Sequence, residues 1–170
     1  QTASVAESAS SGASVMTLAT TGDVDGNNFA IASGNTGTAF AINAASGAIT
    51  TAAALDYDTT TSYTLGITVS DGDTQDSENV VITITDVNDQ TPAVTVAATY
   101  SQAEAASTAF QAFTMVDTDT SGTYACTLGG DDSADFAKSV SGKVCTVTFA
   151  ANPNYESPAD DDTDNVYDLT

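Results

Sequence analysis

Residues 62–85 read SYTLGITVSDGDTQDSENVVITIT, and this stretch decides the fold. Apolar side chains occupy every second position from Tyr63 to Val69 and again from Val80 to Ile84, mostly with Thr or Gly between them. Successive side chains of a strand point to opposite faces, so a period of two predicts strands that are buried on one side. Asp71-Gly72 is a turn former, and it predicts that the two strands are antiparallel neighbours.

The same pattern recurs outside this stretch. Residues 144–149, VCTVTF, also alternate, and further turn formers separate the runs at Gly34-Asn35, Ser46-Gly47 and Ser141-Gly142. The many Thr residues agree with strands, because their branched side chains pack well on a pleated surface. Short strands with a turn every 8–12 residues or so are typical of a β-sandwich. We therefore predict an all-β fold.

The charge of the chain is strongly one-sided. It has 23 Asp and Glu against 2 Lys and Arg, no His, and a net charge of −21 over 170 residues. Since Lys138 and Lys143 are its only basic side chains, the sequence argues against nucleic acid and anionic membranes as partners. The lack of His removes the usual acid–base group near neutral pH. Hydrophobic residues make up 41% of the chain, so a core can form.

Cys126 and Cys145 are the only cysteines, and their spacing matches no metal-binding pattern. A disulfide between neighbouring strands would suit a secreted protein, and two unpaired buried thiols are the alternative. No apolar run is long enough to predict a membrane span. The first residues lack a basic signal-peptide start, so an exported protein would already have lost its signal. We expect an extracellular location, secreted or at the cell surface.

The chain repeats itself. Gln1-Thr2-Ala3 reappears as Gln90-Thr91-Pro92-Ala93, and later motifs follow in the same order in both halves. This predicts two domains, 1–89 and 90–170, with the boundary near Pro92. The Ala-rich stretch 102–113 has helical propensity. The same place in the first half resembles strand, turn and strand, so we predict that arrangement here as well.

The acidic residues are grouped, and neutral runs of Ala, Ser, Thr and Val separate the groups. The groups are Asp23-Val24-Asp25, Asp56-Tyr57-Asp58, Asp71-Gly72-Asp73, Asp86-Val87-Asn88-Asp89, Asp117-Thr118-Asp119 and Asp160 to Asn165. Grouped hard oxygen ligands favour Ca²⁺, which takes six to eight oxygens. A solvated turn would explain any single pair. Recurrence at matching places in two repeats favours the metal.

The order of these motifs resembles the cadherin family over nearly the whole first repeat. The family patterns x-E-x, D-x-D, L-D-R-E, x-D-x and D-x-N-D-N-x-P are matched by Glu7, Asp23-Val24-Asp25, Leu55-Asp56-Tyr57-Asp58, Ser70-Asp71-Gly72 and Asp86 to Pro92. The second repeat is similar to microbial cadherin-like domains, in which N-Y-E-x-P precedes D-x-D-N-x-Y. The resemblance implies tandem Greek-key β-sandwich domains of the immunoglobulin-like type.

The resemblance also implies Ca²⁺ at the joint between tandem domains. The implied ligands are Glu7, Asp56, Asp58, Asp86 and Asp89, then Asn88 and the Gln90 carbonyl of the linker, then Asp117 and Asp119. Asp58 stands where the family has Glu, and its shorter side chain would lose bidentate reach. Gln90 replaces an Asn that contributes only its backbone. Ions shared by two domains would convert a hinge into a rigid rod.

Other acidic positions predict further sites. Asp23, Asp25 and Asp71 would face a preceding domain, and Glu104, Asn154 and Glu156 are the counterparts in the second repeat. Asp160, Asp162 and Asp164, with Asn165, would either hold another ion or form a solvated loop.

The second repeat is expected to lack its last strand or strands. By comparison with the first repeat, the counterpart of Asp71 would fall beyond Thr170. Either the chain is a piece of a longer tandem array, or copies join head to tail, each completing its neighbour's sheet. Its partners would then be neighbouring domains or further copies. A cell-surface protein or glycan is a further candidate partner.

The function predicted from the sequence is an extracellular structural or adhesive module stiffened by Ca²⁺. The alternative is a non-catalytic carbohydrate-binding module of a secreted enzyme, which needs exposed aromatic side chains on a sheet face. The chain has 6 Tyr, 6 Phe and no Trp, which disfavours that alternative. A glycosidase with paired carboxylates is less favoured still, because the acids have metal-like spacings and no apolar pocket is evident to raise a pKa. We therefore expect no enzymatic activity.

Overall fold

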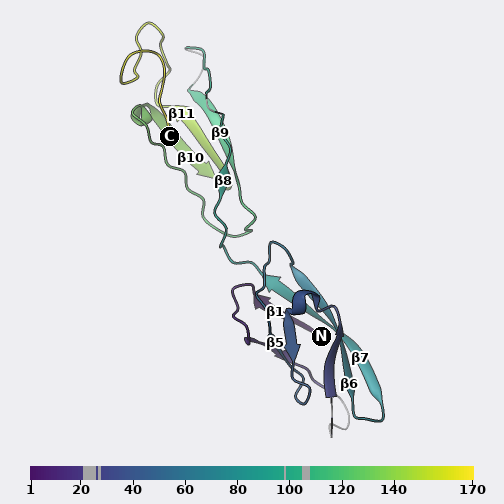
Figure 1. Ribbon diagram of the computed structural model, residues 1–170. Helices are drawn as coiled ribbons and strands as arrows, with labels where there is room; N and C mark the ends of the chain where they lie inside the picture. Colours follow the sequence, from purple (N-terminus) through teal and green to yellow (C-terminus); the bar gives the residue numbers. More distant parts are fainter. Residues whose placement is uncertain (21–25, 27, 98, 105–107) are drawn as a thin grey trace. The chain divides into compact units, whose positions relative to one another are not determined.

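The computed structural model describes residues 1–170 except 21–25, 27, 98 and 105–107. The predicted ligands Asp23 and Asp25 therefore lie outside the described residues. The chain forms two compact units (Figure 1). Unit 1 consists of Gln1–Asp89 together with Asp119–Ser121, and unit 2 consists of Gln90–Thr118 and Gly122–Thr170.

Unit 1 is built from two sheets. The first has the strand order β1-β7-β6-β3 and the second β2-β5-β4. The strands are β1 (Thr2–Ala6), β2 (Ser14–Thr17), β3 (Asn28–Ser33), β4 (Phe40–Ile42), β5 (Ala48–Thr51), β6 (Ser62–Ser70) and β7 (Gln75–Thr85), with a short 3₁₀ turn, η1 (Thr36–Thr38). Strand β1 runs parallel to β7, and β6 is antiparallel to β7. The Asp71-Gly72 turn joins β6 and β7, as the sequence predicts.

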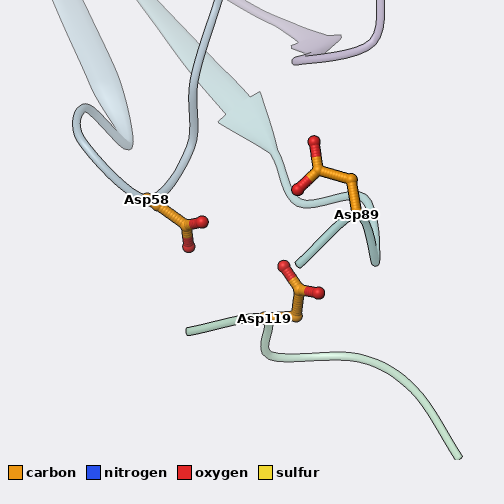
Figure 2. Close-up of side chains that lie close together, drawn as sticks. All are labelled: Asp58, Asp89 and Asp119. Atoms are coloured by element: carbon orange, nitrogen blue, oxygen red, sulfur yellow. The ribbon is translucent and has the colours of Figure 1, made fainter. Parts of the chain in front are cut away.

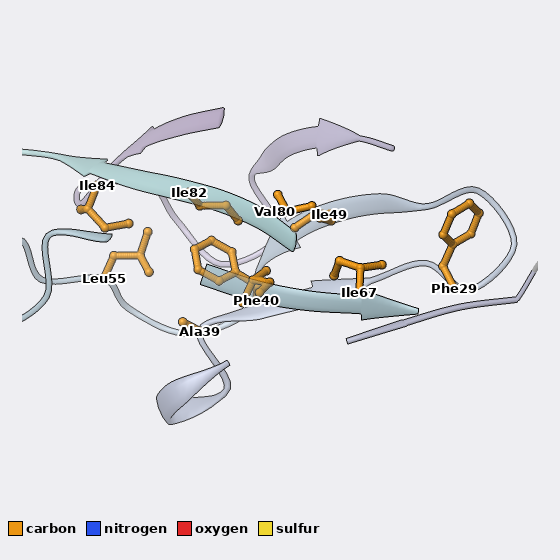
Figure 3. Packing of buried hydrophobic residues seen from close by; sticks show 10 residues of the cluster. Phe29, Ala39, Phe40, Ile49, Leu55, Ile67, Val80, Ile82 and Ile84 are labelled. Atoms are coloured by element: carbon orange, nitrogen blue, oxygen red, sulfur yellow. The ribbon is translucent and has the colours of Figure 1, made fainter. Parts of the chain in front are cut away.

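The core of unit 1 lies between these sheets. Leu65 of β6 and Ile82 of β7 are fully buried and belong to one cluster with Ile49 of β5 in the other sheet. Figure 3 shows Ile49 close to Ile82. The ring of Phe40 packs edge-on against Tyr63 with centroids 5.1 Å apart. Each buried aliphatic side chain contributes about 1.5–3 kcal/mol, so the core orders the strand ends from which the acidic loops leave.

The described residues of unit 2 form one sheet with the strand order β10-β11-β9-β8. Its elements are β8 (Ala93–Val94), β9 (Ala109–Val116), η2 (Ser133–Asp135), β10 (Phe136–Ser141) and β11 (Val144–Phe149). Irregular segments take the place of a second sheet and pack Tyr124, Leu128, Tyr167 and Leu169 on the core. Gly129 and Thr170 exchange two backbone hydrogen bonds of 2.7 and 2.8 Å. The all-β prediction is confirmed.

Two local expectations for unit 2 differ from the structure. Cys126 and Cys145 form a disulfide, but only Cys145 lies on a strand, because Cys126 belongs to the irregular segment 122–129. The bond therefore joins the sheet to the segment packed on it. In the described part of 102–113, only residues from Ala109 onward form a strand, so the first strand expected there is absent from 102–104. Ala103 and Glu104 belong to residue types that are depleted in strands, which agrees with this difference.

Candidate metal centre

Three carboxylates of unit 1 meet at one point. Asp58, Asp89 and Asp119 each place one oxygen within 4.8 Å of the other two, and Figure 2 shows the side chains converging from three separate segments. Asp119 is 1% exposed, whereas Asp58 and Asp89 are exposed. At about 4 Å, each pair of charges repels by about 1 kcal/mol in bulk water and by more when partly buried. The arrangement therefore favours a cation.

Glu7 positions two of these segments. It is 9% exposed, and its two oxygens accept hydrogen bonds from the backbone N–H groups of Tyr57 (2.5 Å) and Val87 (2.7 Å). Glu7 follows β1, so this carboxylate joins the ends of three chain segments. Asp58 follows Tyr57 directly, and Asp89 lies two residues after Val87. The two hydrogen bonds of Glu7 therefore hold both aspartates in place.

The third segment is tied down through Asp86. Asp86 Oδ2 accepts hydrogen bonds from the hydroxyl and the backbone N–H of Thr120, the latter at 2.7 Å. The hydrogen bond from the Thr120 hydroxyl is the main reason why the pKa of Asp86 lies below its usual value. Asp86 Oδ1 is buried without a hydrogen-bond partner in the described structure. A buried carboxylate oxygen needs a donor or a cation, so Asp86 is a further candidate ligand.

Asn88 lies against the same segment. With its amide nitrogen facing Asp119 and Ser121, it donates to Asp119 Oδ2 at 3.1 Å and to the Ser121 carbonyl at 3.0 Å. With its amide oxygen facing them instead, the Asn88 oxygen, Asp119 Oδ2 and the Ser121 carbonyl oxygen would converge. A bound cation requires such an arrangement of oxygens. The position therefore fits both a hydrogen-bonded and a metal-bound state.

The remaining predicted ligands of this site are placed differently. The Asp56 carboxylate is exposed and accepts hydrogen bonds from Thr59, from its N–H at 3.1 Å and from its hydroxyl at 2.8 Å. Gln90 and Asp117 belong to unit 2. The Asp117 carbonyl accepts a hydrogen bond from Lys143 Nζ at 2.6 Å. None of these three belongs to the group of three carboxylates described above.

Asp71 is used by its own turn. Its Oδ1 accepts backbone hydrogen bonds from Thr74 (2.8 Å) and Asp73 (3.0 Å). The bond from Thr74, followed by that from Asp73, lowers the pKa of Asp71. This carboxylate is exposed, so the turn leaves it accessible to a further ligand.

Unit 2 repeats one contact of unit 1. Glu104 Oε2 accepts a hydrogen bond from the Tyr155 N–H at 2.9 Å, as Glu7 does from Tyr57. Asn154 Oδ1 accepts one from the Glu156 N–H at 3.1 Å. Glu104, Asn154 and Glu156 are exposed. The repeated contact shows that matching motifs adopt matching local structure.

A second group of carboxylates lies within unit 2. Asp160, Asp162 and Asp164 each place one oxygen within 4.8 Å of the others. Partial loss of hydration within the loop, followed by repulsion from Asp164, raises the pKa of the exposed Asp162. Buried Asp132 supports this loop, and the sequence patterns did not single it out. Its role depends on contacts with residues far along the chain, which no local motif signals.

The comparisons with known proteins address the family directly. The cadherin domain model matches residues 1–88, just over half of the chain. The chain belongs to the cadherin family. Human protocadherin gamma-A6 is 34% identical over 118 residues, which are 66% of this chain and 13% of that protein. Neural-cadherin of Drosophila melanogaster is 44% identical over 64 residues, 38% of this chain and 2% of that protein. This cadherin chain spans a small part of either relative.

Solved structures agree on the fold. The protocadherin GammaB4 extracellular domain matches 92% of this cadherin chain, with a TM-score of 0.70 at 22% identity, over 26% of its own chain. Human protocadherin-24 EC1-2 matches 99% of this chain with a TM-score of 0.66 at 19% identity, over 88% of its own chain. At these identities the likeness concerns the fold alone.

Membership of the family establishes the broad function class. Cadherin domains are extracellular, calcium-dependent adhesive repeats and are not enzymes. The location of this chain is therefore extracellular, as the sequence predicts. Among the described residues, no helix is long and apolar enough to cross a bilayer.

The two hydrogen bonds that Glu7 accepts are expected to stabilise unit 1 against unfolding. Glu7→Gln keeps one acceptor and places an amide nitrogen against a backbone donor, so we expect unit 1 to lose about 1–3 kcal/mol of unfolding free energy even without Ca²⁺. Glu104→Gln changes an exposed residue with one such bond and should cost under about 0.5 kcal/mol. Urea unfolding in chelator measures both variants, and equal losses would contradict the role given to Glu7.

Proposed function

We propose that this chain is a calcium-stiffened structural or adhesive module, in which Ca²⁺ bound by Asp58, Asp89 and Asp119 fixes the joint between successive repeats. One observation carries the proposal. Two of the three converging carboxylates come from residues 1–89, and the third comes from Asp119–Ser121, whose flanking residues on both sides belong to unit 2. An ion that holds Asp119 therefore restrains the chain that leads into and out of the second unit.

The ligand chemistry suits Ca²⁺. The group consists of carboxylates, with the buried Asp86 Oδ1 and the Asn88 amide as further oxygens on the same segments. Ca²⁺ binds oxygens at about 2.3–2.6 Å, so two ligands on opposite sides of one ion are about 5 Å apart. The separations of up to 4.8 Å among the three oxygens lie within that span. Mg²⁺ needs a tighter octahedral shell and keeps more water, so it should bind less well.

The role of each residue follows from its contacts. Asp58, Asp89 and Asp119 would bind the ion directly, and Glu7 would position the first two segments. Asp86 would both hold Thr120 and offer its buried oxygen. Glu7, Asp56, the Gln90 carbonyl and Asp117 remain proposed ligands of the same joint. When bound, the ion would supply charge neutralisation, and the protein would supply the preformed segment ends.

The ends of the two units suggest how the module is used. We assign Asp71, Asp23 and Asp25 to a joint with a preceding repeat, and Glu104, Asn154 and Glu156 to a joint with a following one. Neighbouring domains of a longer chain would complete these half-sites, and so would further copies of this chain joined head to tail. The repeated Glu104–Tyr155 contact supports a second joint of the same kind.

The distance between the units tests the proposal. Spin labels at Ala30→Cys in β3 and Ser139→Cys in β10, both exposed positions, report the distribution of distances between units. We expect a narrow distribution in Ca²⁺ and a broad one in chelator. The distance distribution of the Asp119→Asn protein should stay broad in Ca²⁺, because the substitution removes the charge of a ligand.

Asp76→Asn is the matched control for this test. Asp76 is exposed near the start of β7, whereas the acidic segment follows the end of that strand. At about 3.3 Å per residue, the ten residue steps from Asp76 to Asp86 span roughly 30 Å. The distance distribution of this variant should narrow in Ca²⁺, as that of the parent protein does. Equal widths in Ca²⁺ and in chelator for the parent protein would reject the proposal.

A further inference from the structure

A loop near the end of unit 2 holds the second group of carboxylates. Asp160, Asp162 and Asp164 place oxygens within 4.8 Å of one another, and all three belong to one short stretch of chain. Acidic residues gathered on a surface loop are common without a metal. What distinguishes this loop is the state of Asp160.

Asp160 is buried and only half satisfied. It is 3% exposed, and its Oδ2 accepts a hydrogen bond from the Asn165 N–H at 2.9 Å. Its Oδ1 is buried and has no hydrogen-bond partner in the described structure. A buried carboxylate oxygen without a donor or a cation carries a desolvation cost that an exposed, hydrated oxygen does not. A cation shared with Asp162 and Asp164 would satisfy it.

The backbone of the loop is already arranged around this point. The acids stand at the first, third and fifth positions, and Asn165 at the sixth has a positive φ of 66°. In EF-hand loops the ligands occupy positions 1, 3 and 5, and a Gly at position 6 makes the sharp turn. Asn is among the residues that tolerate this left-handed conformation best. The spacing and the turn thus match the first half of a calcium loop.

Contacts from elsewhere in unit 2 hold the loop closed. Buried Asp132 accepts backbone hydrogen bonds from Asp161 and Asp168, each at 2.6 Å, so a single carboxylate joins both ends. Gly130 has a φ of +94°, and a Cβ there would lie 2.1 Å from the Asp168 carbonyl oxygen. Only Gly permits this close approach. The loop is therefore preorganised before any ion binds.

We propose that residues 160–165 form a self-contained Ca²⁺ site within unit 2, separate from the joint. It needs ligands from one unit alone, so it would bind its ion whether or not neighbouring repeats are present. The bound ion would restrain the segment that follows the loop, which contains Tyr167. The ring of Tyr167 packs against those of Phe136 and Phe149, with centroids 5.5 and 5.2 Å apart. An ion in the loop would anchor that segment on the core.

Calcium titration of the full chain tests this site. Isothermal titration should find at least one Ca²⁺ fewer in Asp162→Asn than in the parent protein, or one site weakened at least tenfold. Asp161→Asn removes the same charge from an exposed neighbour outside the group and should leave the count unchanged. Asp162 is exposed, so its variant is expected to fold. An Asp162→Asn protein that binds as many Ca²⁺ ions as the parent, each with the parent's affinity, would overturn the proposal.

A second measurement separates this site from the joint. Backbone amide NMR signals of Thr163, Asp164 and Asn165 should shift on addition of Ca²⁺. They should shift equally in Asp119→Asn, which removes a joint ligand, and not in Asp162→Asn. If the Asp119→Asn protein loses these shifts, the loop is not an independent site. If the parent protein shows no shifts at these amides, the loop binds no ion, whatever happens at the joint.

Discussion

Removal of Ca²⁺ is expected to lower the melting temperature of unit 1 by roughly 10–20 °C. A ligand at 100 times its Kd stabilises the folded state by about 2.7 kcal/mol per site. For a domain of 60–100 residues, each kcal/mol corresponds to about 4–8 °C. The effect rests on the repulsion among Asp58, Asp89 and Asp119, which the ion cancels and the chelator restores.

Scanning calorimetry in excess Ca²⁺ and in chelator measures this shift. Asp119→Asn should lose more than half of it, because the side chain is buried at the meeting point. Asp76→Asn should keep it. Mg²⁺ at the same concentration should restore little of the stability. A parent protein that melts at the same temperature in both buffers would show that no ion is bound to the folded state of unit 1.

Reduction of the disulfide is expected to destabilise unit 2 by about 3 kcal/mol. The bond closes a loop that lowers the entropy of the unfolded chain, and reduction restores that entropy. Cys126 and Cys145 are 19 residues apart and join the sheet to the irregular segment packed on it. Among the described residues, the core of unit 2 has five buried apolar side chains and that of unit 1 has ten. Unit 2 therefore depends more on this bond.

The two calorimetric transitions should respond differently to a reductant. In saturating Ca²⁺, the unit 2 transition should fall by roughly 10–20 °C, since each kcal/mol shifts a small domain by about 4–8 °C. The unit 1 transition should not move, because that unit has no cysteine. The Cys126→Ala/Cys145→Ala protein should match the reduced parent. A reductant that moves both transitions equally would contradict this assignment.

The sequence predicted the regular strands well. Leu65 and Ile82 lie in alternating runs, and both are buried in strands of one sheet. Alternation reports burial directly, because the side chains of a strand point to its two faces in turn. The family resemblance was confirmed for the same half of the chain, where five motifs occur in order.

The irregular parts were harder to predict. Cys126 lies in a segment without a ladder, and segments of that kind leave no period in the sequence. The resemblance implied that Asp119 joins ligands from residues 1–89, but the Asp86–Thr120 hydrogen bonds that hold its segment there, between residues 34 apart, were not predicted. Asp132 likewise bonds to residues 29 and 36 positions away. Such contacts follow from the folded chain and have no local signature.

The parallel pairing of β1 with β7 has a mechanical consequence. The chain enters unit 1 at the start of β1 and leaves it after the end of β7, and the five paired positions run from Thr2↔Val81 to Ala6↔Thr85. Tension between these two points pulls the strands past each other along their length. The ladder is then loaded in shear, so its bonds must break together instead of peeling apart one by one. A domain threaded in this way resists extension best along the direction in which a tether would pull it.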